Sequence, residues 1–283
     1  MLLDGKKVSA EIKLEVKEEV ESFLKQGLPQ PGLAVIIVGD DKASEIYVNS
    51  KTRSCAEAGI KSEHIKLPEN TTEADLIKEV ERLNGDDTID AILVQMPLPR
   101  HINASAVIEK ISPKKDVDCF TSTNIGNVYL GAENAVYPCT PFGIVQILKK
   151  YELSVEGKDV VVIGRSNIVG KPMALMLVNM GATVTICNSK TKDLKEKTKQ
   201  AEILISCVGK KDFITEDMVM PGAIIIDVGI NRVDGKIYGD VDFENVSKKA
   251  SYITPVPGGV GVMTVAMLLK NCINLYKKNR GEK

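Results

Sequence analysis

Tyr47 and Lys51 are residues whose types and spacing suit catalysis. They stand four positions apart in a segment of helical character, so they share one helix face. A lysine amine acts as a base only when neutral, and an ordinary pKa of about 10.4 leaves it almost fully protonated at pH 7. A lysine base therefore requires burial or a nearby cation to lower its pKa. A solvated Lys51 beside a half-buried Tyr47 is the alternative that involves no chemistry.

Gln95 directly follows the apolar run at residues 91–94, and Pro97 and Pro99 come soon after it. The run predicts a buried strand, which the prolines prevent from leading straight into a helix. At the end of that strand, the amide can orient the Lys51 amine through a hydrogen bond without adding charge. The alternative is that Gln95 satisfies loop backbone.

Asp116 and Asp118 are two carboxylates separated by Val117. In an extended segment the two carboxylates would lie on the same face and Val117 on the other. The alternative is a turn in which the aspartates bond to nearby backbone N–H groups. In either case, an acidic side chain suits the recognition of paired N–H donors on a ring.

Residues 158–172 predict a strand, a glycine turn and the beginning of a helix. Val160–Ile163 is a β-branched run, Gly164 permits a tight turn, and Pro172 suits the first turn of a helix that reaches Met180. A helix N-terminus after such a turn is a site for a phosphate. The spacing Gly164-x-Ser166-x-x-x-Gly170 differs from the usual G-x-G-x-x-G, so a purely structural turn is the alternative.

The next predicted strand, residues 183–187, bears on the choice of nucleotide. An NAD site places an acid near the end of this strand, but here the chain continues Asn188-Ser189-Lys190 with no acid before Asp193. Arg165 adds a second cation in the first loop. A carboxylate would repel a 2′-phosphate, whereas Arg, Ser and Lys side chains can bond to it. The pattern favours NADP over NAD.

Strands alternate with helices along the chain, which favours parallel sheets joined by right-handed crossovers. Helices are expected at 8–26, 43–58, 72–84, 141–151, 173–180 and 263–276, with Thr72 and Thr140 as N-caps. Strands are expected at 33–38, around 65, and at 91–94, 160–163, 183–187, 203–206 and 223–229. We therefore predict an α/β protein of two doubly wound lobes with mostly parallel sheets and a cleft between them. Ligands bind beyond the carboxyl ends of such strands.

Residues 253–261 form a segment rich in proline and glycine before the last predicted helix. Two prolines and three glycines among residues 255–261 indicate a fixed path that allows close backbone approach to a ligand. A simple connection into the helix is the alternative.

Composition excludes several classes of protein. The 283 residues carry a formal net charge of −1 with mixed signs throughout, which argues against a nucleic-acid surface. No apolar run approaches the roughly 20 residues of a membrane span, and the N-terminus lacks the apolar core of a signal peptide. The six cysteines form no C-x-x-C pair and are expected to be buried free thiols, as in a cytoplasmic protein. With only two histidines, no metal site is predicted.

Six motifs occur in one order along the chain. They are Tyr47-Val-x-x-Lys51, Val94-Gln-x-Pro-Leu-Pro99, Lys115-Asp-Val-Asp118, Pro138-Cys-Thr-Pro141, Gly164-Arg-Ser-x-Ile-Val-Gly-x-Pro172 and Pro255-Val-Pro-Gly-Gly-Val-Gly261. Together they resemble the bifunctional methylenetetrahydrofolate dehydrogenase/cyclohydrolase family over nearly the whole chain.

The resemblance implies two linked reactions in one active site. NADP⁺ takes a hydride from 5,10-methylenetetrahydrofolate to give the 5,10-methenyl cation, which water then opens to 10-formyltetrahydrofolate. The resemblance also implies a homodimer. The folate-binding catalytic domain would comprise residues 1–139 with a C-terminal helix at about 263–283, and residues 140–262 would form a Rossmann-type NADP domain.

The resemblance also implies a role for individual residues. Lys51 would assist water addition and proton transfer, Gln95 would position Lys51, and Asp118 would hold the pterin edge. Tyr47 would stack on the aromatic part of folate, and the loop from Pro257 would close over the substrate. The implied substrate contacts are Tyr47, Val94, Met96, Pro257, Gly258 and Gly259, and the implied NADP contacts are Gly164, Arg165, Ser166, Ser189 and Ile230.

The chain departs from the family pattern at two positions. Cys119 stands where the family usually has glycine, and Val262 stands where it usually has proline. We expect Cys119 to restrict the backbone beside the pterin site and Val262 to loosen the start of the last helix. Alternative functions are a dehydrogenase without cyclohydrolase activity, disfavoured by Lys51 and Gln95, and a silent NADP-binding protein.

Overall fold

The computed structural model describes residues 1–40 and 42–281, without the side chains of residues 42–47. Its chain divides into two compact units, which we describe separately. The N-terminal unit comprises Glu11–Asn127, Asn134–Tyr137 and Val265–Lys283, and the C-terminal unit comprises Met1–Ala10, Val128–Glu133 and Pro138–Thr264. None of the described helices is both long and apolar enough to cross a membrane.

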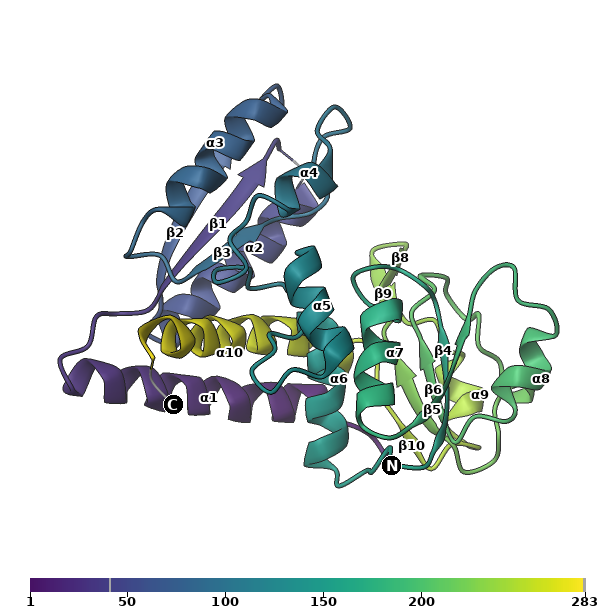
Figure 1. Ribbon diagram of the computed structural model, residues 1–283. Coiled ribbons are helices and arrows are strands. Elements are labelled where there is room, and N and C mark those ends of the chain that lie inside the picture. The colour runs from purple at the N-terminus through teal and green to yellow at the C-terminus, as the bar shows by residue number, and fades with distance from the viewer. Residues whose placement is uncertain (41, 282–283) are drawn as a thin grey trace. The chain divides into compact units, whose positions relative to one another are not determined.

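A small parallel sheet forms the centre of the N-terminal unit (Figure 1). Its strand order is β2-β1-β3, with bounds β1 Gly32–Val38, β2 Lys61–Leu67 and β3 Ala91–Val94. Every residue of β1 and β3 is buried, as the continuous apolar runs predict. Helices α2 (Lys42–Glu57) and α3 (Glu73–Asn84) connect the strands, and Thr72 caps α3 as predicted by accepting a hydrogen bond from the Asp75 N–H.

Most of each of the long helices α1 (Gly5–Lys25) and α10 (Val260–Arg280) belongs to this unit, where the two helices lie side by side (Figure 1). Lys277 Nζ bonds to Glu19 Oε1 at 2.6 Å, and the rings of Phe23 and Tyr276 stack with centroids 4.9 Å apart. Helix α10 begins at Val260, three residues earlier than predicted. Gly261 therefore lies within the first turn of the helix and does not delay its start.

The C-terminal unit contains a five-stranded parallel sheet of order β10-β7-β6-β4-β5. Its strands are β4 Asp159–Ile163, β5 Thr183–Cys187, β6 Ile203–Ser206, β7 Ile224–Asp227 and β10 Tyr252–Ile253. From β4 the chain moves to β5 on one side and then to β6 on the other, which makes the carboxyl ends of β4 and β6 the topological switch point. This fold confirms the prediction of an α/β protein with parallel sheets.

Shorter elements complete the molecule, and most of them lack a periodic pattern long enough to predict. They are α4 Ala104–Ile108, α5 Ser122–Leu130, α7 Gly170–Asn179, α8 Leu194–Thr198, η1 Glu216–Met218, α9 Phe243–Val246 and the antiparallel pair β8 Asn231–Val233 with β9 Lys236–Tyr238.

The predicted cap of α6 (Cys139–Lys150) is wrong. Pro138, not Thr140, is the N-cap residue, and it makes no capping bond through its side chain. The backbone of Pro138 is extended and the helix follows at once, so Thr140 already lies in the first turn. Its hydroxyl lies 3.1 Å from that of Thr264.

Candidate active site

Lys51 and Gln95 form a direct contact at the carboxyl end of the N-terminal sheet. Lys51 lies on α2 with 9% of its surface exposed, and its Nζ donates to Gln95 Oε1 at 2.9 Å. Gln95 follows β3; its backbone N–H donates to Ile36 O, and its Nε2 donates to Met96 O. The Gln95 amide thus has a fixed orientation and presents its oxygen to the amine. Tyr47 belongs to α2, but its side chain lies outside the described residues.

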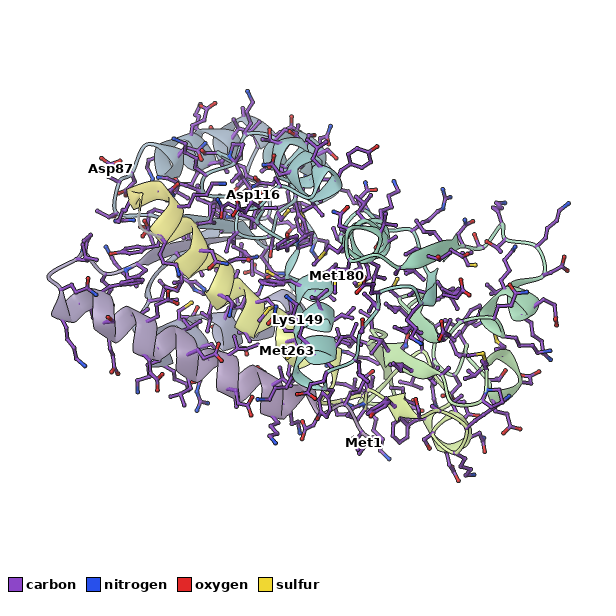
Figure 2. The ribbon with its side chains drawn as sticks, turned by 60° about the horizontal axis from the view of Figure 1, so that its bottom comes forward. Met1, Asp87, Asp116, Lys149, Met180 and Met263 are labelled. Carbon is purple, nitrogen blue, oxygen red and sulfur yellow. The ribbon has the colours of Figure 1, made fainter. Side chains whose placement is uncertain are left out.

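Asp116 and Asp118 lie in a turn and not in an extended segment, so the turn alternative is correct. The Cys119 N–H bonds back to Asp116 O at 3.4 Å, and both Asp116 and Val117 are buried. Asp116 is enclosed by the N-terminal unit (Figure 2), whereas Asp118 is half-buried. The two carboxylates therefore have different environments, although only Val117 separates them.

The buried Asp116 carboxylate organises the chain that follows it. It accepts hydrogen bonds from the backbone N–H groups of Phe120 and Thr121, from the Thr121 hydroxyl at 2.8 Å and from Asn124 Nδ2 at 3.0 Å. A buried carboxylate requires this many donors. Asp116 thus has a structural role that the sequence did not distinguish from that of Asp118.

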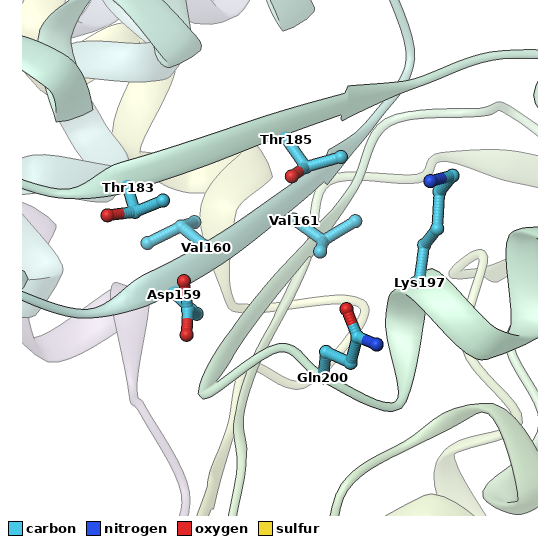
Figure 3. Close-up of a pocket in the computed structure, with 7 residues that line it drawn as sticks. All are labelled: Asp159, Val160, Val161, Thr183, Thr185, Lys197 and Gln200. Carbon is cyan, nitrogen blue, oxygen red and sulfur yellow. The ribbon is translucent and has the colours of Figure 1, made fainter.

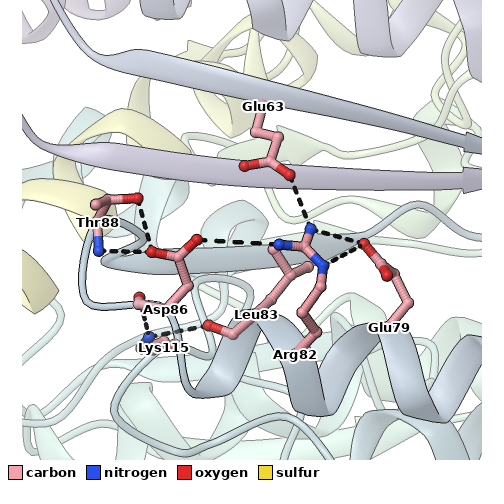
Figure 4. A network of polar contacts seen from close by, with 7 residues as sticks. All are labelled: Glu63, Glu79, Arg82, Leu83, Asp86, Thr88 and Lys115. Carbon is pink, nitrogen blue, oxygen red and sulfur yellow. Dashed lines mark hydrogen bonds and ion pairs between the residues drawn. The ribbon is translucent and has the colours of Figure 1, made fainter.

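Lys115, three residues before Asp118, makes further contacts that hold the same turn. Lys115 Nζ donates to the carbonyl oxygens of Leu83 and Asp86 at the end of α3, beside an ion-pair network centred on Arg82 (Figure 4). Burial lowers the pKa of the Lys115 amine, although nearby carboxylates oppose the shift. The Lys115 carbonyl accepts from the Ile92 N–H of β3 at 2.7 Å. The turn that carries Asp118 is therefore attached to the strand that ends at Gln95.

Cys119 adopts the left-handed backbone conformation that favours glycine, with φ of 59°. Its side chain is completely buried, and its Sγ donates to Val136 O at 3.0 Å. Burial raises the pKa of this thiol far above its usual value, so it stays protonated and can donate. Cys119 thus adopts the same kind of conformation as glycine and gains a hydrogen bond that glycine lacks.

Gly164 and Gly170 bring a strand, a turn and a helix into close contact in the C-terminal unit. Gly164 has φ of 130°, and a Cβ there would lie 2.4 Å from Cys207 Sγ and 2.7 Å from Cys207 O. A Cβ at Gly170 would lie 2.2 Å from Gly164 O. Both positions therefore require glycine, and the N-terminus of α7 lies against the end of β4. Because a ligand phosphate can approach such a backbone closely, the turn suits the predicted role.

The Ser166 hydroxyl lies just before α7, where it accepts from the N–H groups of Val169 and Gly170 at 3.2 and 3.3 Å. Arg165, Ser189 and Lys190 are exposed. They follow the ends of β4 and β5, which pair in register at Ile163 and Cys187. Two cations and a hydroxyl therefore lie at neighbouring strand ends, as an anionic group such as a 2′-phosphate would require.

The Pro/Gly loop is only partly exposed. Pro257 is exposed, whereas Gly258 and Gly259 are buried against the first turn of α1. Gly258 O accepts from the Lys6 N–H at 3.1 Å, and a Cβ at Gly5 would lie 2.0 Å from Gly259 O. Ile230 is 43% exposed and lies beside Gly261, where a Cβ would be 3.2 Å from its Cδ1. The sequence predicted that the backbone of this loop approaches a ligand closely. In the structure, Gly258 and Gly259 make such an approach to the first turn of α1.

A polar hollow of about 110 Å³ lies elsewhere on the C-terminal unit (Figure 3). It is lined by Asp159, Val160, Val161, Thr183, Thr185, Lys197 and Gln200. These residues come from the beginnings and middles of β4 and β5 and from the region of α8, not from the carboxyl ends of the strands. The hollow is therefore separate from the glycine turn. Within the described residues, no group of three or more His, Cys, Asp or Glu side chains could hold a metal ion.

Sequence reasoning missed two buried acids in the C-terminal unit, Asp227 and Asp240, which are 3% and 0% exposed. Burial raises the pKa of Asp227 to about 6, and the charge of Asp240 adds to this shift while backbone N–H donors oppose it. The available signal was an acid beside glycine and valine in each of Asp227-Val-Gly229 and Gly239-Asp-Val241.

Many known proteins are similar to this chain in sequence and in structure. Residues 3–118 match the catalytic domain, and residues 138–280 the NAD(P)-binding domain, of tetrahydrofolate dehydrogenase/cyclohydrolase. A bifunctional protein FolD from Sulfurihydrogenibium sp. (strain YO3AOP1) is 56% identical over 279 residues, 98% of each chain. The crystal structure of the bifunctional enzyme FolD from Campylobacter jejuni has a TM-score of 0.97 at 52% identity and 99% coverage of both chains.

A third relative has been solved with a nucleotide bound. The Trypanosoma brucei methylenetetrahydrofolate dehydrogenase-cyclohydrolase, complexed with NADP cofactor and inhibitor, has a TM-score of 0.94 at 37% identity, covering 99% of this chain and 98% of that one. The two domains of the family match most of the chain, and a relative shares more than half of its residues with it. This chain therefore belongs to the tetrahydrofolate dehydrogenase/cyclohydrolase family.

Proposed function

We propose that this protein oxidises 5,10-methylenetetrahydrofolate with NADP⁺ and then hydrolyses the 5,10-methenyltetrahydrofolate product to 10-formyltetrahydrofolate. The enzyme is a methylenetetrahydrofolate dehydrogenase and a methenyltetrahydrofolate cyclohydrolase in folate one-carbon metabolism. Family membership and the bifunctional names of the relatives support both activities. The observation that carries the second activity is the 2.9 Å hydrogen bond between the buried Lys51 amine and Gln95.

The residues of the glycine turn fit NADP. Gly164 and Gly170 leave no space for a Cβ and keep backbone close to the end of β4, which suits a pyrophosphate. Arg165, with Ser189 from the next strand end, would hold the 2′-phosphate, and Ser166 and Ile230 would complete the contacts. When bound, NADP⁺ supplies the hydride acceptor.

The folate would be held by residues of the N-terminal unit and by the Pro/Gly loop. Asp118 is half-buried on a rigid turn, so its carboxylate can accept two hydrogen bonds from the pterin ring. Tyr47 would stack on the aromatic part of the substrate. The further contacts proposed are Val94, Met96, Pro257, Gly258 and Gly259. Orientation is the main task of these residues in the oxidation, because nitrogen atoms of the substrate stabilise the cation that forms.

Lys51 would move the proton during ring opening. Water adding to the methenyl carbon must lose a proton, and a neutral amine within reach can accept it. A substrate that carries positive charge favours the neutral form of an amine beside it. Gln95 would hold the amine in position, since its own amide is oriented by its bond to Met96 O.

We also infer the organisation of the enzyme. Residues 1–139 with the C-terminal helix from about 263 would bind folate, and residues 140–262 would bind NADP. We propose a homodimer, which the exposed edge strand β5, with Ile186 at 43% exposure, supports. None of the six cysteines of the chain forms a disulfide, which supports a reducing compartment such as the cytoplasm.

Replacing Lys51 by Met tests the proposed function. We expect ring opening of supplied 5,10-methenyltetrahydrofolate to fall by about 100-fold or more, because the proton acceptor is lost. Oxidation of 5,10-methylenetetrahydrofolate should continue, so methenyl-folate and NADPH accumulate together. Absorbance of both products, followed in one assay, measures the two rates.

The matched control is Lys78→Met, which removes an exposed amine on α3 that pairs with Asp75. We expect this variant to retain both activities. Ring opening by Lys51→Met at the parent rate would show that another group is the base. A parent protein that neither reduces NADP⁺ nor opens methenyl-folate would refute the proposed function itself.

A further inference from the structure

Two buried carboxylates lie at the carboxyl end of the sheet in the C-terminal unit. Asp227 is the last residue of β7, and Asp240 follows β9. Neither residue belongs to the glycine turn. Buried acids require strong compensation by hydrogen bonds, so their donors reveal what they hold in place.

Asp240 accepts hydrogen bonds from two separate segments, residues 206–210 and Asn231. Its Oδ2 accepts from the Ser206 hydroxyl at 3.0 Å and from the N–H groups of Val208 at 2.7 Å and Gly209 at 3.2 Å. Its Oδ1 accepts from the Lys210 N–H at 2.9 Å and from Asn231 Nδ2 at 3.0 Å. Three consecutive N–H groups after β6 thus converge on one carboxylate, which fixes the path of the loop 207–210.

Asp227 holds the neighbouring segment in a matching way. Its carboxylate accepts from the N–H groups of Gly229, Asp240 and Val241 at 2.9, 2.9 and 3.0 Å. Each acid also fills the space beside a glycine of the other segment. A Cβ at Gly229 would lie 2.2 Å from Asp240 Oδ1, and a Cβ at Gly239 would lie 1.8 Å from Asp227 Oδ2.

The segments held in this way adjoin the proposed nucleotide site. The loop 207–210 begins at the carboxyl end of β6, which is half of the topological switch point. Cys207 lies directly against Gly164, because only the absence of a Cβ at Gly164 allows their contact. Ile230, a proposed NADP contact, directly follows Gly229. The two buried acids therefore hold the loop 207–210, which lies against Gly164, and the segment of Gly229, which precedes Ile230.

We propose that Asp240 is a positioning residue for NADP binding, which holds the loop 207–210 in the conformation that accepts the dinucleotide. The inference rests on the proposed function for the identity of the nucleotide. The Asp240 carboxylate accepts from five donors, whereas an asparagine would turn an NH₂ group toward some of them. The loop then loses its fixed path while the residues of the N-terminal unit keep theirs.

The test compares Asp240→Asn with the parent in two separate measurements. We expect the Kd of NADP⁺, measured by titration calorimetry without folate, to rise at least tenfold. Hydrolysis of supplied 5,10-methenyltetrahydrofolate in the absence of nucleotide should stay within twofold of the parent, which a general loss of structure would not allow. The matched control is Asp242→Asn at the N-cap of α9, where asparagine caps equally well, so both values should stay within twofold.

A folded Asp240→Asn protein that binds NADP⁺ within twofold of the parent would overturn the inference. If that variant does not fold, Asn231→Ala removes a single donor from Asp240 Oδ1 and should weaken NADP⁺ binding about threefold; unchanged binding would then overturn it. A parent protein that binds no NADP⁺ would refute the proposed function instead.

Discussion

At the scale of single residues, Cys119 illustrates how a side chain compensates for its backbone. A non-glycine residue in the left-handed region costs roughly 1 kcal/mol. Cys119 offsets this cost by complete burial and by the hydrogen bond from its thiol to Val136 O. Because burial raises the pKa of the thiol, Cys119 is a packing residue and not a reactive one. Its proximity to Asp118 therefore adds no chemistry to the proposed site.

A second single residue, Asp227, makes the stability of the protein depend on pH. Burial raises its pKa from 3.8 in the unfolded chain to about 6, so the folded state binds the proton more tightly. The resulting stabilisation is present below pH 3.8 and is lost as the pH rises through about 6. We expect Asp227→Asn to remove this dependence. Between pH 4 and 7 the free energy of unfolding of the parent should fall, relative to the variant, by about 2–3 kcal/mol.

Urea denaturation at several pH values measures the effect of Asp227→Asn. The difference in free energy of unfolding between the parent and Asp227→Asn is followed as the pH changes. Its absolute value is not used, because the lost bond to Val241 lowers the stability of the variant at every pH. Asp234→Asn, at an exposed turn between β8 and β9, is the control and should parallel the parent. A constant difference between Asp227→Asn and the parent from pH 4 to 7 would show that Asp227 does not titrate in this range.

At the scale of elements, the contact between β4 and α7 depends on Gly170. A Cβ there would meet the backbone of Gly164 at 2.2 Å, and backbone cannot move aside as a flexible side chain can. We expect Gly170→Ala to separate helix from strand, to lower the free energy of unfolding by about 2 kcal/mol and to weaken NADP⁺ binding by tenfold or more. Chemical denaturation and calorimetric titration measure the two effects.

Gly126→Ala is the matched control for Gly170→Ala. Gly126 lies within helix α5, where a Cβ would meet nothing within 4 Å. Alanine should therefore stabilise the protein by up to about 1 kcal/mol, through helix propensity alone. Equal stabilities for the two variants would contradict the close contact at Gly170.

At the scale of the whole molecule, the chain returns at its end to the unit that its first half builds. Arg280 on α10 pairs with Asp90, a side chain only 3% exposed that also accepts from the Gly32 N–H at the start of β1. Arg280→Met leaves this carboxylate buried without its cation. We expect a loss of about 2 kcal/mol in the free energy of unfolding, measured by urea denaturation.

The control for Arg280→Met is Arg53→Met, which breaks the ion pair between Arg53 and Glu57. The side chains of these two residues are 83% and 58% exposed. Exposed pairs contribute little, so the change should stay within about 0.5 kcal/mol. If both variants lose the same stability, the pairing of Arg280 with Asp90 does not fasten α10 to the sheet.

The sequence by itself determined the class of fold, the glycine turn and the family. Continuous apolar runs such as residues 33–38 are typical of buried parallel strands, and they became β1 and its neighbours. The capping role of Thr72 was also predictable, because its donor lies only three residues away. These features depend on residue type and on contacts close in sequence, which a linear pattern records.

Only the tertiary structure decided which of two similar acids stays accessible and which acids hold loops in place. Asp116 is buried and Asp118 is not, because donors from α5 and from Asn271, whose Nδ2 bonds to Val117 O across 154 positions, hold the turn. The donors of Asp240 lie up to 34 positions away, so no local pattern marks it as an anchor. The burial of Gly258 and Gly259 likewise depends on packing against the first turn of α1. Such properties follow from which segments meet in space, and spacing along the chain does not contain that information.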